Sequence, residues 1–421
     1  MRVLVVGGGA REHALVRALL ADPSVSAVLA APGNAGIAAE VATRPLDVTD
    51  AAAVGRLAAE LAAGEGLDLV VVGPEVPLVA GAADAVRASG VACFGPSRDA
   101  ARLEGSKAFA KDVMAAAGVP TARALVCATP DEVAAALDAL GPPYVVKDDG
   151  LAAGKGVVVT DDRAVAVAHA ASCRWVVVEE YLDGPEVSLF GITDGTIVLP
   201  LVPAQDFKRA YDGDAGPNTG GMGAYSPLPW APEHLVEEVL RTVLQPTVDE
   251  MARRGTPFAG LLYAGLALTS RGVRVVEFNA RFGDPETQVV LPRLRTPLGG
   301  LLLAAATGRL AEVGALEWSP DAAVTVVVAA HGYPEAPRAG DEVTGLATAA
   351  GLEGVSVLHA GTAADASGRV VTSGGRVLSV VGTGAHLAAA RDRAYAGVAA
   401  VGIDGAHHRS DIAADAAGVR A

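Results

Sequence analysis

Residues 1–15 read MRVLVVGGGAREHAL, and this stretch decides the class of fold. Val3–Val6 form a continuously apolar run, which is typical of a parallel strand buried on both faces, and the helical stretch Glu12–Leu20 follows. The first hundred residues repeat this alternation, with apolar runs at 27–31, 67–72 and 91–94 and helical stretches at 51–62 and 79–88. The pattern predicts an N-terminal α/β domain, residues 1–100, in which βαβ units form a parallel sheet.

Three glycine-rich turns follow the predicted strands, at Gly7–His13, Pro32–Gly36 and Gly73–Glu75. Ligands of open α/β sheets bind beyond the carboxyl ends of the strands, so these turns form a candidate site for an anion or a sugar phosphate. The first turn partly matches the dinucleotide pattern G-x-G-x-x-G, but Glu12 stands where the third glycine belongs. Nicotinamide dinucleotide binding, a plain tight turn and another phosphate-bearing ligand are therefore competing interpretations.

The composition is that of an acidic globular protein. The chain has 33 Lys and Arg against 48 Asp and Glu, a net charge of −15, which argues against nucleic acid or an anionic membrane as its main partner. Three well-separated cysteines exclude a disulfide framework and are typical of a reducing compartment. No apolar stretch reaches the ~18 residues of a membrane span, and the N-terminal apolar run is too short for a signal peptide. We expect a monomeric, cytoplasmic protein that binds small molecules.

Lysine is rare, because only five of the 33 basic residues are lysines. A chain that otherwise uses arginine should keep lysine where a compact, mobile ammonium group is needed. Two of the five, Lys147 and Lys155, lie in the loop KDDGLAAGKG between two predicted strands. Glycines such as Gly154 and Gly156 let backbone amides approach phosphate oxygens, so this loop is a candidate polyphosphate site. A solvated hairpin loop is the alternative.

A candidate metal site lies at the end of the predicted hairpin 261–279. Glu277 and Asn279 are two residues apart on a strand and therefore point to the same face. A carboxylate and an amide oxygen side by side suit Mg²⁺, which takes few protein ligands and keeps phosphate oxygens and water molecules. Arg281 occupies the next position on that face. Polar residues that are merely solvated at a strand end are the alternative.

Residues 205–227 form a predicted loop that is rich in Gly, Asp and Pro and too long to be only a connection. A lid over a substrate or metal and a surface Ω-loop explain it equally well. Further strands and a helix predict a small C-terminal α/β domain, residues 319–421, without a motif of its own.

Several strings together resemble the phosphoribosylamine–glycine ligase (glycinamide ribonucleotide synthetase) family of the ATP-grasp superfamily. They span nearly the whole chain: GGGAREHAL, APGNAG, VVGPEVPLV, LEGSKAF, KDDGLAAGKGV, VEEYLDGPEVS, QDFKR, DGPNTGGMGAYSP, LYAGL and EFNARFGDPETQ. The resemblance implies a multi-domain α/β architecture, in which a Rossmann-like N-terminal domain precedes an ATP-grasp domain at 101–318. Within the latter, residues 120–185 would cover the nucleotide.

The resemblance also implies an activity, the ATP-dependent joining of glycine to 5-phosphoribosylamine. This reaction of purine biosynthesis passes through glycyl phosphate and gives glycinamide ribonucleotide, ADP and phosphate. By the same resemblance, ATP would contact Lys107, Lys147, Gly154, Lys155, Gly156, Glu179, Glu180, Leu182 and Glu186. Mg²⁺, or Mn²⁺ in its place, would bind Glu277 and Asn279, while Arg281 and Lys155 would act in catalysis. Glycine and 5-phosphoribosylamine would lie near Gly8, Gly9, Asn34, Gly36, Glu75, Asp206, Lys208, Gly220, Gly221 and Asp284.

The chain departs from the family pattern at three places. Ala10 ends the string GGGA where the family pattern is GNGG, Asp148 replaces a small residue after Lys147, and the segment 160–175 is short. Asp148 adds an acid beside the expected polyphosphate, and the short segment implies a trimmed loop over ATP. Another ATP-grasp ligase or carboxylase, a nicotinamide oxidoreductase and a nucleotide sensor are the alternative functions.

Overall fold

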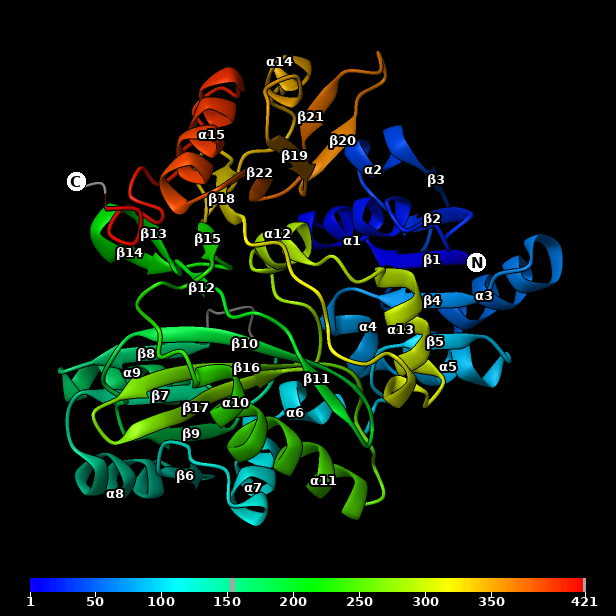
Figure 1. The fold of residues 1–421 in the computed structure, drawn as a ribbon. Coiled ribbons are helices and arrows are strands. Elements are labelled where there is room, and N and C mark those ends of the chain that lie inside the picture. The colour runs from blue at the N-terminus through cyan, green and yellow to red at the C-terminus, as the bar shows by residue number, and fades with distance from the viewer. Residues whose placement is uncertain (152–155, 419–421) are drawn as a thin grey trace.

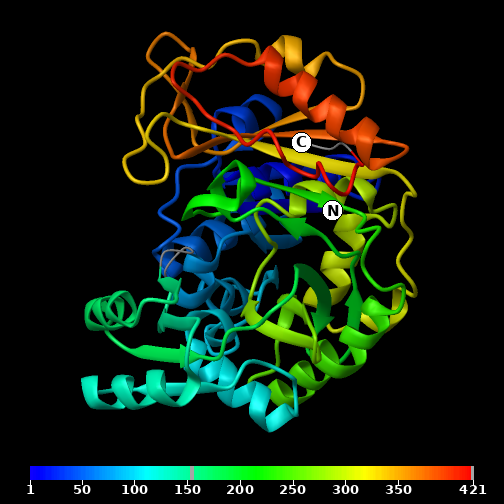
Figure 2. The same ribbon diagram turned by 90° about the vertical axis from the view of Figure 1, so that its left-hand side faces the viewer.

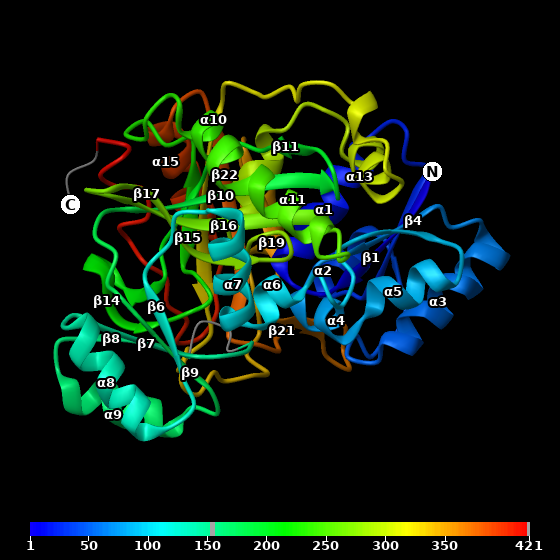
Figure 3. The same cartoon turned by 90° about the horizontal axis from the view of Figure 1, so that it is seen from below.

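The computed structural model describes residues 1–151 and 156–418, which form three α/β units (Figure 1). The N-terminal unit (blue) lies beside the C-terminal unit (orange and red), and the antiparallel sheets of the middle unit lie below in this view. Seen from below, the helices α8 (Pro130–Leu140) and α9 (Arg163–Ser172) lie at the opposite end of the molecule from α3 (Ala51–Glu65) (Figure 3). Within the described ranges, no helix is long and apolar enough to cross a membrane.

The N-terminal unit is a five-stranded parallel sheet in the order β3-β2-β1-β4-β5. Its strands are β1 (Arg2–Gly7), β2 (Ala27–Pro32), β3 (Ala42–Thr43), β4 (Leu69–Val72) and β5 (Ala92–Phe94), and its helices α1 (Ala10–Leu20), α2 (Ala35–Glu40), α3, α4 (Glu75–Ala80) and α5 (Ala82–Ala88). The parallel sheet is confirmed. The strand order reverses between β1 and β4, so the glycine turns that follow these two strands lie at the position where such sheets bind ligands.

The middle unit contains two four-stranded antiparallel sheets. The first has the order β6-β9-β7-β8 and consists of β6 (Ala124–Cys127), β7 (Tyr144–Asp148), β8 (Val157–Thr160) and β9 (Val176–Glu179). The second has the order β11-β10-β16-β17 and consists of β10 (Glu186–Asp194), β11 (Val198–Pro200), β16 (Ala259–Thr269) and β17 (Gly272–Asn279). The first sheet, with α8 and α9, projects from the body of the molecule (Figure 2, teal).

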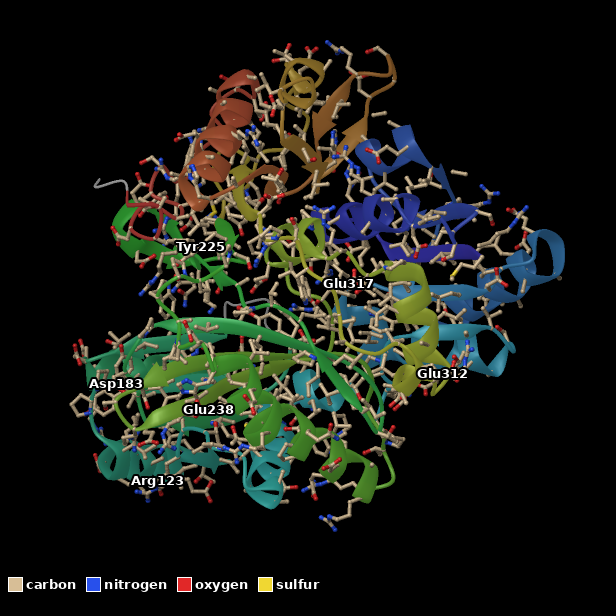
Figure 4. All side chains as sticks on the ribbon, in the orientation of Figure 1. Arg123, Asp183, Tyr225, Glu238, Glu312 and Glu317 are labelled. Carbon is tan, nitrogen blue, oxygen red and sulfur yellow. The ribbon has the colours of Figure 1, made fainter. Side chains whose placement is uncertain are left out.

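The third unit is built on an antiparallel sheet that draws strands from two distant parts of the chain. Its order is β12-β15-β18-β22-β19, with β12 (Gln205–Asp206), β15 (Gly223–Ser226), β18 (Ala322–Ala329), β19 (Val355–His359) and β22 (Arg376–Gly384). The predicted loop 205–227 is therefore wrong in part, because it also contains the hairpin β13 (Arg209–Tyr211) and β14 (Ala215–Asn218). Tyr225 of β15 lies where this sheet meets the middle unit (Figure 4). Helices α14 (Leu346–Ala350) and α15 (Leu387–Ala400) and the strands β20 (Thr362–Ala364) and β21 (Val370–Thr372) complete the unit.

Three helical stretches of the chain are interrupted. The stretch 98–117 is two helices, α6 (Arg102–Gly105) and α7 (Lys107–Ala117), because Ser106 is extended and its hydroxyl accepts a hydrogen bond from Phe109 N at 3.1 Å. The stretch 79–88 breaks at Gly81, whose φ is +94°. The stretch 232–253 is α10 (Leu235–Val239), a π-helical turn (Leu240–Leu244) and α11 (Gln245–Arg253). Helices α12 (Thr287–Val290) and α13 (Leu298–Ala306) lie in a region for which we predicted no helix.

Two histidines join the N-terminal and C-terminal units. His13 is fully buried in α1, and its Nδ1 accepts a hydrogen bond from the backbone N of His359 at 2.8 Å. His13 therefore carries its proton on Nε2, which donates to Glu40 at 3.0 Å. Asn34 donates to the carbonyl of His359 at 2.7 Å, so the His359 backbone is held on both sides. Burial lowers the pKa of His359 to about 4 and that of His13 below its usual value.

We expect the buried imidazole of His359 to reduce stability as the pH falls. Its pKa in the folded protein lies below the unfolded value of ~6.5, so the unfolded chain takes up the proton first as the pH falls from about 6.5 to 4. Between pH 7 and pH 5 the free energy of unfolding should fall by about 2 kcal/mol from this residue. His359→Gln should lose that part of the pH dependence in urea unfolding, whereas a matched change at exposed His234 should not. Equal pH dependence in wild type and His359→Gln would contradict this account.

Candidate active site

A buried cluster of charged side chains lies where the two middle sheets meet. Lys147 of β7 and Lys111 of α7 both approach Glu179 at the end of β9, with Nζ–Oε2 distances of 3.0 and 3.2 Å. The Nζ of Lys147 also donates to the carbonyl of Val276 on β17 at 3.3 Å, which links the two sheets. Burial lowers the pKa of Lys111 to about 8. One carboxylate with two ammonium partners leaves a positive charge in the cluster for an anionic ligand.

Lys107 is the first residue of α7, and a loop from the middle unit docks on it. Its backbone N donates to Asp149 Oδ1 at 2.5 Å, and its Nζ donates to the carbonyl of Gly150 at 2.9 Å. The hydroxyl of Ser106 donates to Asp149 Oδ2 at 3.1 Å. A carboxylate at the N-terminus of a helix interacts favourably with the helix dipole, and the same position suits a phosphate.

The glycine loop after β7 contains three predicted ATP contacts. Gly154 and Lys155 lie outside the described residues, whereas Gly156 is buried and its carbonyl accepts a hydrogen bond from Asp148 N at 2.8 Å. The Oδ1 of Asp148 accepts a hydrogen bond from Arg174 N at 3.2 Å. Arg174 lies in the short segment 160–175, so two of the departures from the family pattern meet in the structure.

The connection between β9 and β10 passes from one middle sheet to the other and carries Glu180 and Leu182. The Glu180 carboxylate accepts a hydrogen bond from Arg123 N at 3.0 Å and pairs with Arg271 at 3.2 Å. Burial opposes the charged form of Glu180, but these two partners outweigh it and lower its pKa. Leu182 is half-buried on the same connection.

Glu277 and Asn279 end β17 and fit a hard divalent cation. The Glu277 carboxylate has no hydrogen-bond or ion-pair partner among residues 1–151 and 156–418, although it is half-buried. Asn279 is 9% exposed, and within the same ranges its Oδ1 accepts only a 3.5 Å hydrogen bond from Arg281. The described residues contain no cluster of three or more His, Cys, Asp or Glu side chains suited to a metal. Two oxygen donors with free lone pairs fit a cation whose other ligands are phosphate oxygens and water molecules.

Arg281 lies between two acids from the N-terminal part of the chain. Its Nε donates to Glu75 at 3.1 Å, and its Nη2 pairs with Glu104 Oε1 at 2.9 Å. The other oxygen of Glu104 accepts a hydrogen bond from Ala280 N at 2.7 Å. Burial would lower the pKa of Arg281, but the two acids outweigh it and raise that pKa, while burial raises the pKa of Glu104. The guanidinium is thus held rigidly beside Asn279.

Asp206, Lys208 and Glu186 form a second group of charged side chains, on and after β12 and at the start of β10. The Nζ of Lys208 lies 3.4 Å from Asp206 Oδ1 and forms a short ion pair with Glu186. Burial raises the pKa of Asp206 to about 7, and Lys208 lowers the pKa of Glu186. Burial would lower the pKa of Lys208, but the negative charges of Asp206 and Glu186 outweigh burial and raise this pKa. The charge of Glu277 acts in the same direction. This group and the candidate metal ligands therefore share one electrostatic environment.

Glu12 explains why the first glycine turn does not match a dinucleotide fingerprint. Its Oε2 accepts a hydrogen bond from Gly9 N at 2.6 Å, and its Oε1 accepts one from Arg11 Nε at 2.6 Å. The side chain fills the space beside Gly7, where a Cβ would lie 2.6 Å from Glu12 Cγ. A buried carboxylate therefore caps α1 from inside the turn, and the turn has no third glycine that would admit a pyrophosphate.

Asn34, Gly8 and Gly36 belong to the contact between the first and third units. Asn34 caps α2 through Ile37 N at 2.9 Å and donates to the carbonyl of Gly8 at 2.9 Å. At Gly36, a Cβ would lie 2.7 Å from the His13 ring. These residues hold the turn in place, and in the described parts of the chain no hydrogen bond or ion pair joins them to Glu179 or Lys208.

Asp284, Gly220 and Gly221 come together through a residue that we did not predict. Arg376 Nη2 donates to Asp284 Oδ2 at 2.9 Å, and its Nη1 donates to the carbonyl of Gly221 at 3.4 Å and forms a shorter bond to that of Gly220. A Cβ on Gly9 would lie 3.8 Å from Asp284 Oδ2, so the same group reaches the first glycine turn.

Hydrogen bonds and ion pairs thus link most of the predicted site residues that the structure describes. Three residues that we did not predict, Glu12, Glu104 and Arg376, take part in these contacts. Glu104 lies in the string LEGSKAF, of which only the lysine was predicted to contact a ligand. Arg376 follows the pair Gly374–Gly375, and a glycine pair before a lone arginine is the only local signal for it.

Comparisons with known proteins agree with this architecture. The chain matches the N domain of phosphoribosylglycinamide synthetase over residues 1–104, its ATP-grasp (A) domain over 105–287 and its C domain over 323–415. It is 69% identical to the phosphoribosylamine–glycine ligase of Streptomyces coelicolor over 99% of this chain and 100% of that one. The protein of the same name from Mycobacterium bovis is 58% identical over 99% of each chain.

A solved structure agrees as well. The crystal structure of the phosphoribosylamine–glycine ligase from Thermotoga maritima superposes with a TM-score of 0.83 at 34% identity, covering 98% of this chain and 100% of that one. The expected ATP-grasp architecture and the resemblance drawn from the sequence strings are both confirmed. The ATP-grasp domain implies that the protein uses ATP and a divalent metal ion and acts on small molecules. The chain belongs to the phosphoribosylamine–glycine ligase (phosphoribosylglycinamide synthetase) family of ATP-grasp ligases of purine biosynthesis.

Proposed function

We propose that the protein joins glycine to 5-phosphoribosylamine at the expense of ATP, giving glycinamide ribonucleotide, ADP and phosphate. Family membership supports the overall reaction. The observation that carries the proposal is the end of β17, where Glu277 and Asn279 have oxygen lone pairs beside Arg281 that no described residue occupies. These three residues place a metal-binding carboxylate next to a fixed positive charge, which suits the transfer of a phosphoryl group.

We propose that ATP binds between the two middle sheets. Lys147, with Lys107 at the N-terminus of α7, would hold the phosphates, and Gly154, Lys155 and Gly156 would supply a further ammonium and backbone amides. Glu179, Glu180 and Leu182, on and after β9, would line the base, and Glu186 would accept hydrogen bonds from the ribose. The ion pairs of Lys147 and Glu179 orient these two side chains before the nucleotide arrives.

We propose Glu277 and Asn279 as the protein ligands of Mg²⁺, with Mn²⁺ as the alternative. The bound metal supplies positive charge to the phosphate oxygens of the nucleotide. Arg281, fixed by Glu75 and Glu104, would add a guanidinium that stabilises the charge of the transferring phosphoryl group. Its planar fork keeps this position without rearrangement.

The proposed chemistry has two steps. A carboxylate oxygen of glycine attacks the γ-phosphorus of ATP, the bond to the bridging oxygen breaks, and glycyl phosphate and ADP form. The amine of 5-phosphoribosylamine then attacks the acyl carbon, loses a proton and expels phosphate to give the amide. No side-chain nucleophile is required, so the residues act by positioning and by charge.

The second and third substrates would occupy the space between the first and third units. Gly8, Gly9, Asn34 and Gly36 would shape the side of the sugar phosphate. The remaining proposed contacts are Glu75, Asp206, Lys208, Gly220, Gly221 and Asp284. Asp206 and Lys208, with Glu277 nearby, are suited to a zwitterion because they offer both signs of charge.

ADP release tests the proposed function. We expect sustained release only when ATP, a divalent metal, glycine and freshly generated 5-phosphoribosylamine are all present, and omission of either glycine or the amine should abolish steady-state turnover. ADP release that is triggered by another acid would instead indicate a different ATP-grasp ligase or carboxylase. ATP binding without turnover under any combination would indicate a nucleotide sensor.

We expect Lys147→Arg to weaken ATP binding by about tenfold although the charge is kept. The ammonium group is 3.0 Å from Glu179 and 3.3 Å from the carbonyl of Val276, and the side chain is 5% exposed, so a larger planar guanidinium does not fit. Calorimetry with ATP and metal measures this change. Arg163→Lys, an exposed swap on α9 in the same unit, is the control and should bind like wild type. Wild-type affinity in Lys147→Arg would show that the rarity of lysine is a coincidence.

We further propose that the enzyme is a monomer of the cytoplasm. Its three cysteines are free thiols, and Cys93 and Cys127 are buried. Light scattering on the purified protein should give a mass of 42.1 kDa. A mass twice as large would contradict the monomer.

A further inference from the structure

Arg376, the first residue of β22, holds the Gly220–Gly221 turn, which precedes β15, against Asp284, which follows β17. Its guanidinium donates to the backbone carbonyls of Gly220, Gly221 and Asp284 and to the carboxylate of Asp284. The bonds to Asp284 measure 3.0 Å to the carbonyl and 2.9 Å to Oδ2. The side chain is 22% exposed, so most of its donors are used inside the protein. A single side chain thus sets the distance between the Gly220–Gly221 turn and Asp284.

The Gly220–Gly221 turn is held at a second point, and its second glycine is buried. Gly220 N donates to the hydroxyl of Tyr333 at 3.2 Å, while the carbonyl of Gly220 is bound by Arg376. Gly221 has a φ of +105°, and a Cβ there would lie 2.5 Å from Pro285 Cδ. The turn therefore packs directly on the segment after Asp284, and only glycine fits at this position.

The Asp284 carboxylate is oriented, and its partners among residues 1–151 and 156–418 do not use all of its acceptor positions. Its Oδ1 accepts a hydrogen bond from Gln288 Nε2 at 2.7 Å, and its Oδ2 accepts the one from Arg376. A carboxylate offers about four lone-pair positions, so acceptor capacity remains on both oxygens. Burial opposes the charged form of Asp284, but Arg376 and Arg11 outweigh it and keep its pKa low. The group lies beside the first glycine turn, near Gly9.

We propose that Arg376 is a positioning residue for 5-phosphoribosylamine, because it holds Asp284 and the Gly220–Gly221 turn where Asp284 can accept hydrogen bonds from the ribose hydroxyls. This inference rests on the proposed function and assigns to the third unit a part in binding this substrate. Arg376 also neutralises Asp284, which lets a carboxylate lie close to a phosphorylated sugar. A sugar phosphate needs both a hydroxyl acceptor and the absence of net negative charge, and this ion pair provides both.

The geometry requires arginine at this position. Nη1 donates hydrogen bonds to the three carbonyls, while Nη2 donates to the Asp284 carboxylate. The planar guanidinium fixes the angle between these two sets of bonds. A lysine ammonium is a point donor that could reach the carboxylate or the carbonyls, but not both sets with the same orientation. Arg376→Lys should therefore recover part of the binding that Arg376→Met loses.

Steady-state kinetics with each substrate varied in turn test the proposal. Loss of a charged hydrogen-bond partner should raise KM for 5-phosphoribosylamine in Arg376→Met by about 10-fold to 100-fold. KM for ATP and for glycine should stay within about twofold, since Arg376 contacts none of the described residues proposed for ATP. The Kd for glycinamide ribonucleotide, a stable ligand that carries the same ribose, should rise in parallel. Arg369→Met, which removes exposed ion pairs to Glu342 and Asp365 in the same unit, should leave all values unchanged.

Two further variants separate positioning from a purely structural role. Asp284→Asn combined with Arg376→Met should cost little more than either change alone, because both act through the same contact. Tyr333→Phe removes one hydroxyl from the turn and should raise KM for 5-phosphoribosylamine alone by about twofold to fivefold. If Arg376→Met does not fold, the KM of Tyr333→Phe for 5-phosphoribosylamine tests the proposal in its place. Additive effects in the double variant, or equal rises of KM for all three substrates, would overturn the proposal.

The activity of the wild-type protein separates a failure of the proposed function from a failure of the proposed role of Arg376. Wild type that fails to release ADP with glycine and 5-phosphoribosylamine would refute the proposed function itself. Wild type that is active, together with an Arg376→Met variant whose KM for 5-phosphoribosylamine is unchanged, would refute only the role of Arg376.

Discussion

Glu277→Gln should lower kcat by at least about 100-fold while the protein keeps its fold. The carboxylate has no hydrogen-bond or ion-pair partner within the described parts of the chain, so the amide breaks no contact of the protein. Glutamine keeps the size of the side chain and one oxygen, but removes the negative charge that a divalent cation requires. Turnover measured against metal concentration should therefore show a higher metal requirement together with a lower maximum.

Glu312→Gln is the matched control for this change. Glu312 is exposed and lies away from β17, beyond α13 (Figure 4). Its ion pair with Arg309 is long, at 3.7 Å, and solvent-exposed, so the same substitution there should leave turnover and metal dependence unchanged. Wild-type kcat and metal dependence in Glu277→Gln would remove Glu277 from the metal site.

Arg281→Met is expected to affect both turnover and stability. Turnover should fall by about 1,000-fold, because the guanidinium is the fixed positive charge next to the candidate metal ligands. The change also leaves the buried Glu104 without its ion-pair partner and leaves Glu75 with the longer ion pair to Arg11 at 3.9 Å, which should cost about 3 kcal/mol in the free energy of unfolding. Arg281→Lys should lie between wild type and Arg281→Met, since one ammonium cannot bridge both acids as the fork does.

A second substitution separates the two effects of Arg281. Glu104→Gln in the Arg281→Met background removes the uncompensated buried carboxylate and should restore part of the lost stability without restoring turnover. Turnover that recovers together with stability would mean that Arg281 acts only through the fold. Urea unfolding and ADP release on the same preparations measure the two quantities.

Local patterns predicted those parts of the fold that depend on neighbouring residues. The apolar run Val3–Val6 lies in the parallel strand β1, and the predicted hairpin 261–279 is the antiparallel pair β16 and β17. The prediction of a loop at 205–227 was wrong in part because β15 pairs with β18, about a hundred residues further along the chain. Glycine- and proline-rich sequence with short strands has no local periodicity, so only its partner strand makes it a sheet.

The candidate site was predictable where its residues lie in motif-like strings. The rarity of lysine pointed to Lys147, which the structure places in a buried cluster with Glu179. Glu104 and Arg376 were missed because their roles arise from contacts with residues far away in the sequence, at Arg281 and Asp284. Glu12 was noted only as a missing glycine, although its carboxylate is what fills the turn.

The origin of the oxygen in the released phosphate tests the central claim most directly, namely that ATP activates the carboxylate of glycine. Glycine labelled with ¹⁸O in both carboxylate oxygens should react with ATP and 5-phosphoribosylamine to give phosphate that carries one labelled oxygen. The glycinamide ribonucleotide should then retain the other. Released phosphate without label, with ADP formation still dependent on glycine, would contradict the acyl-phosphate route and with it the proposed roles of Glu277, Asn279 and Arg281.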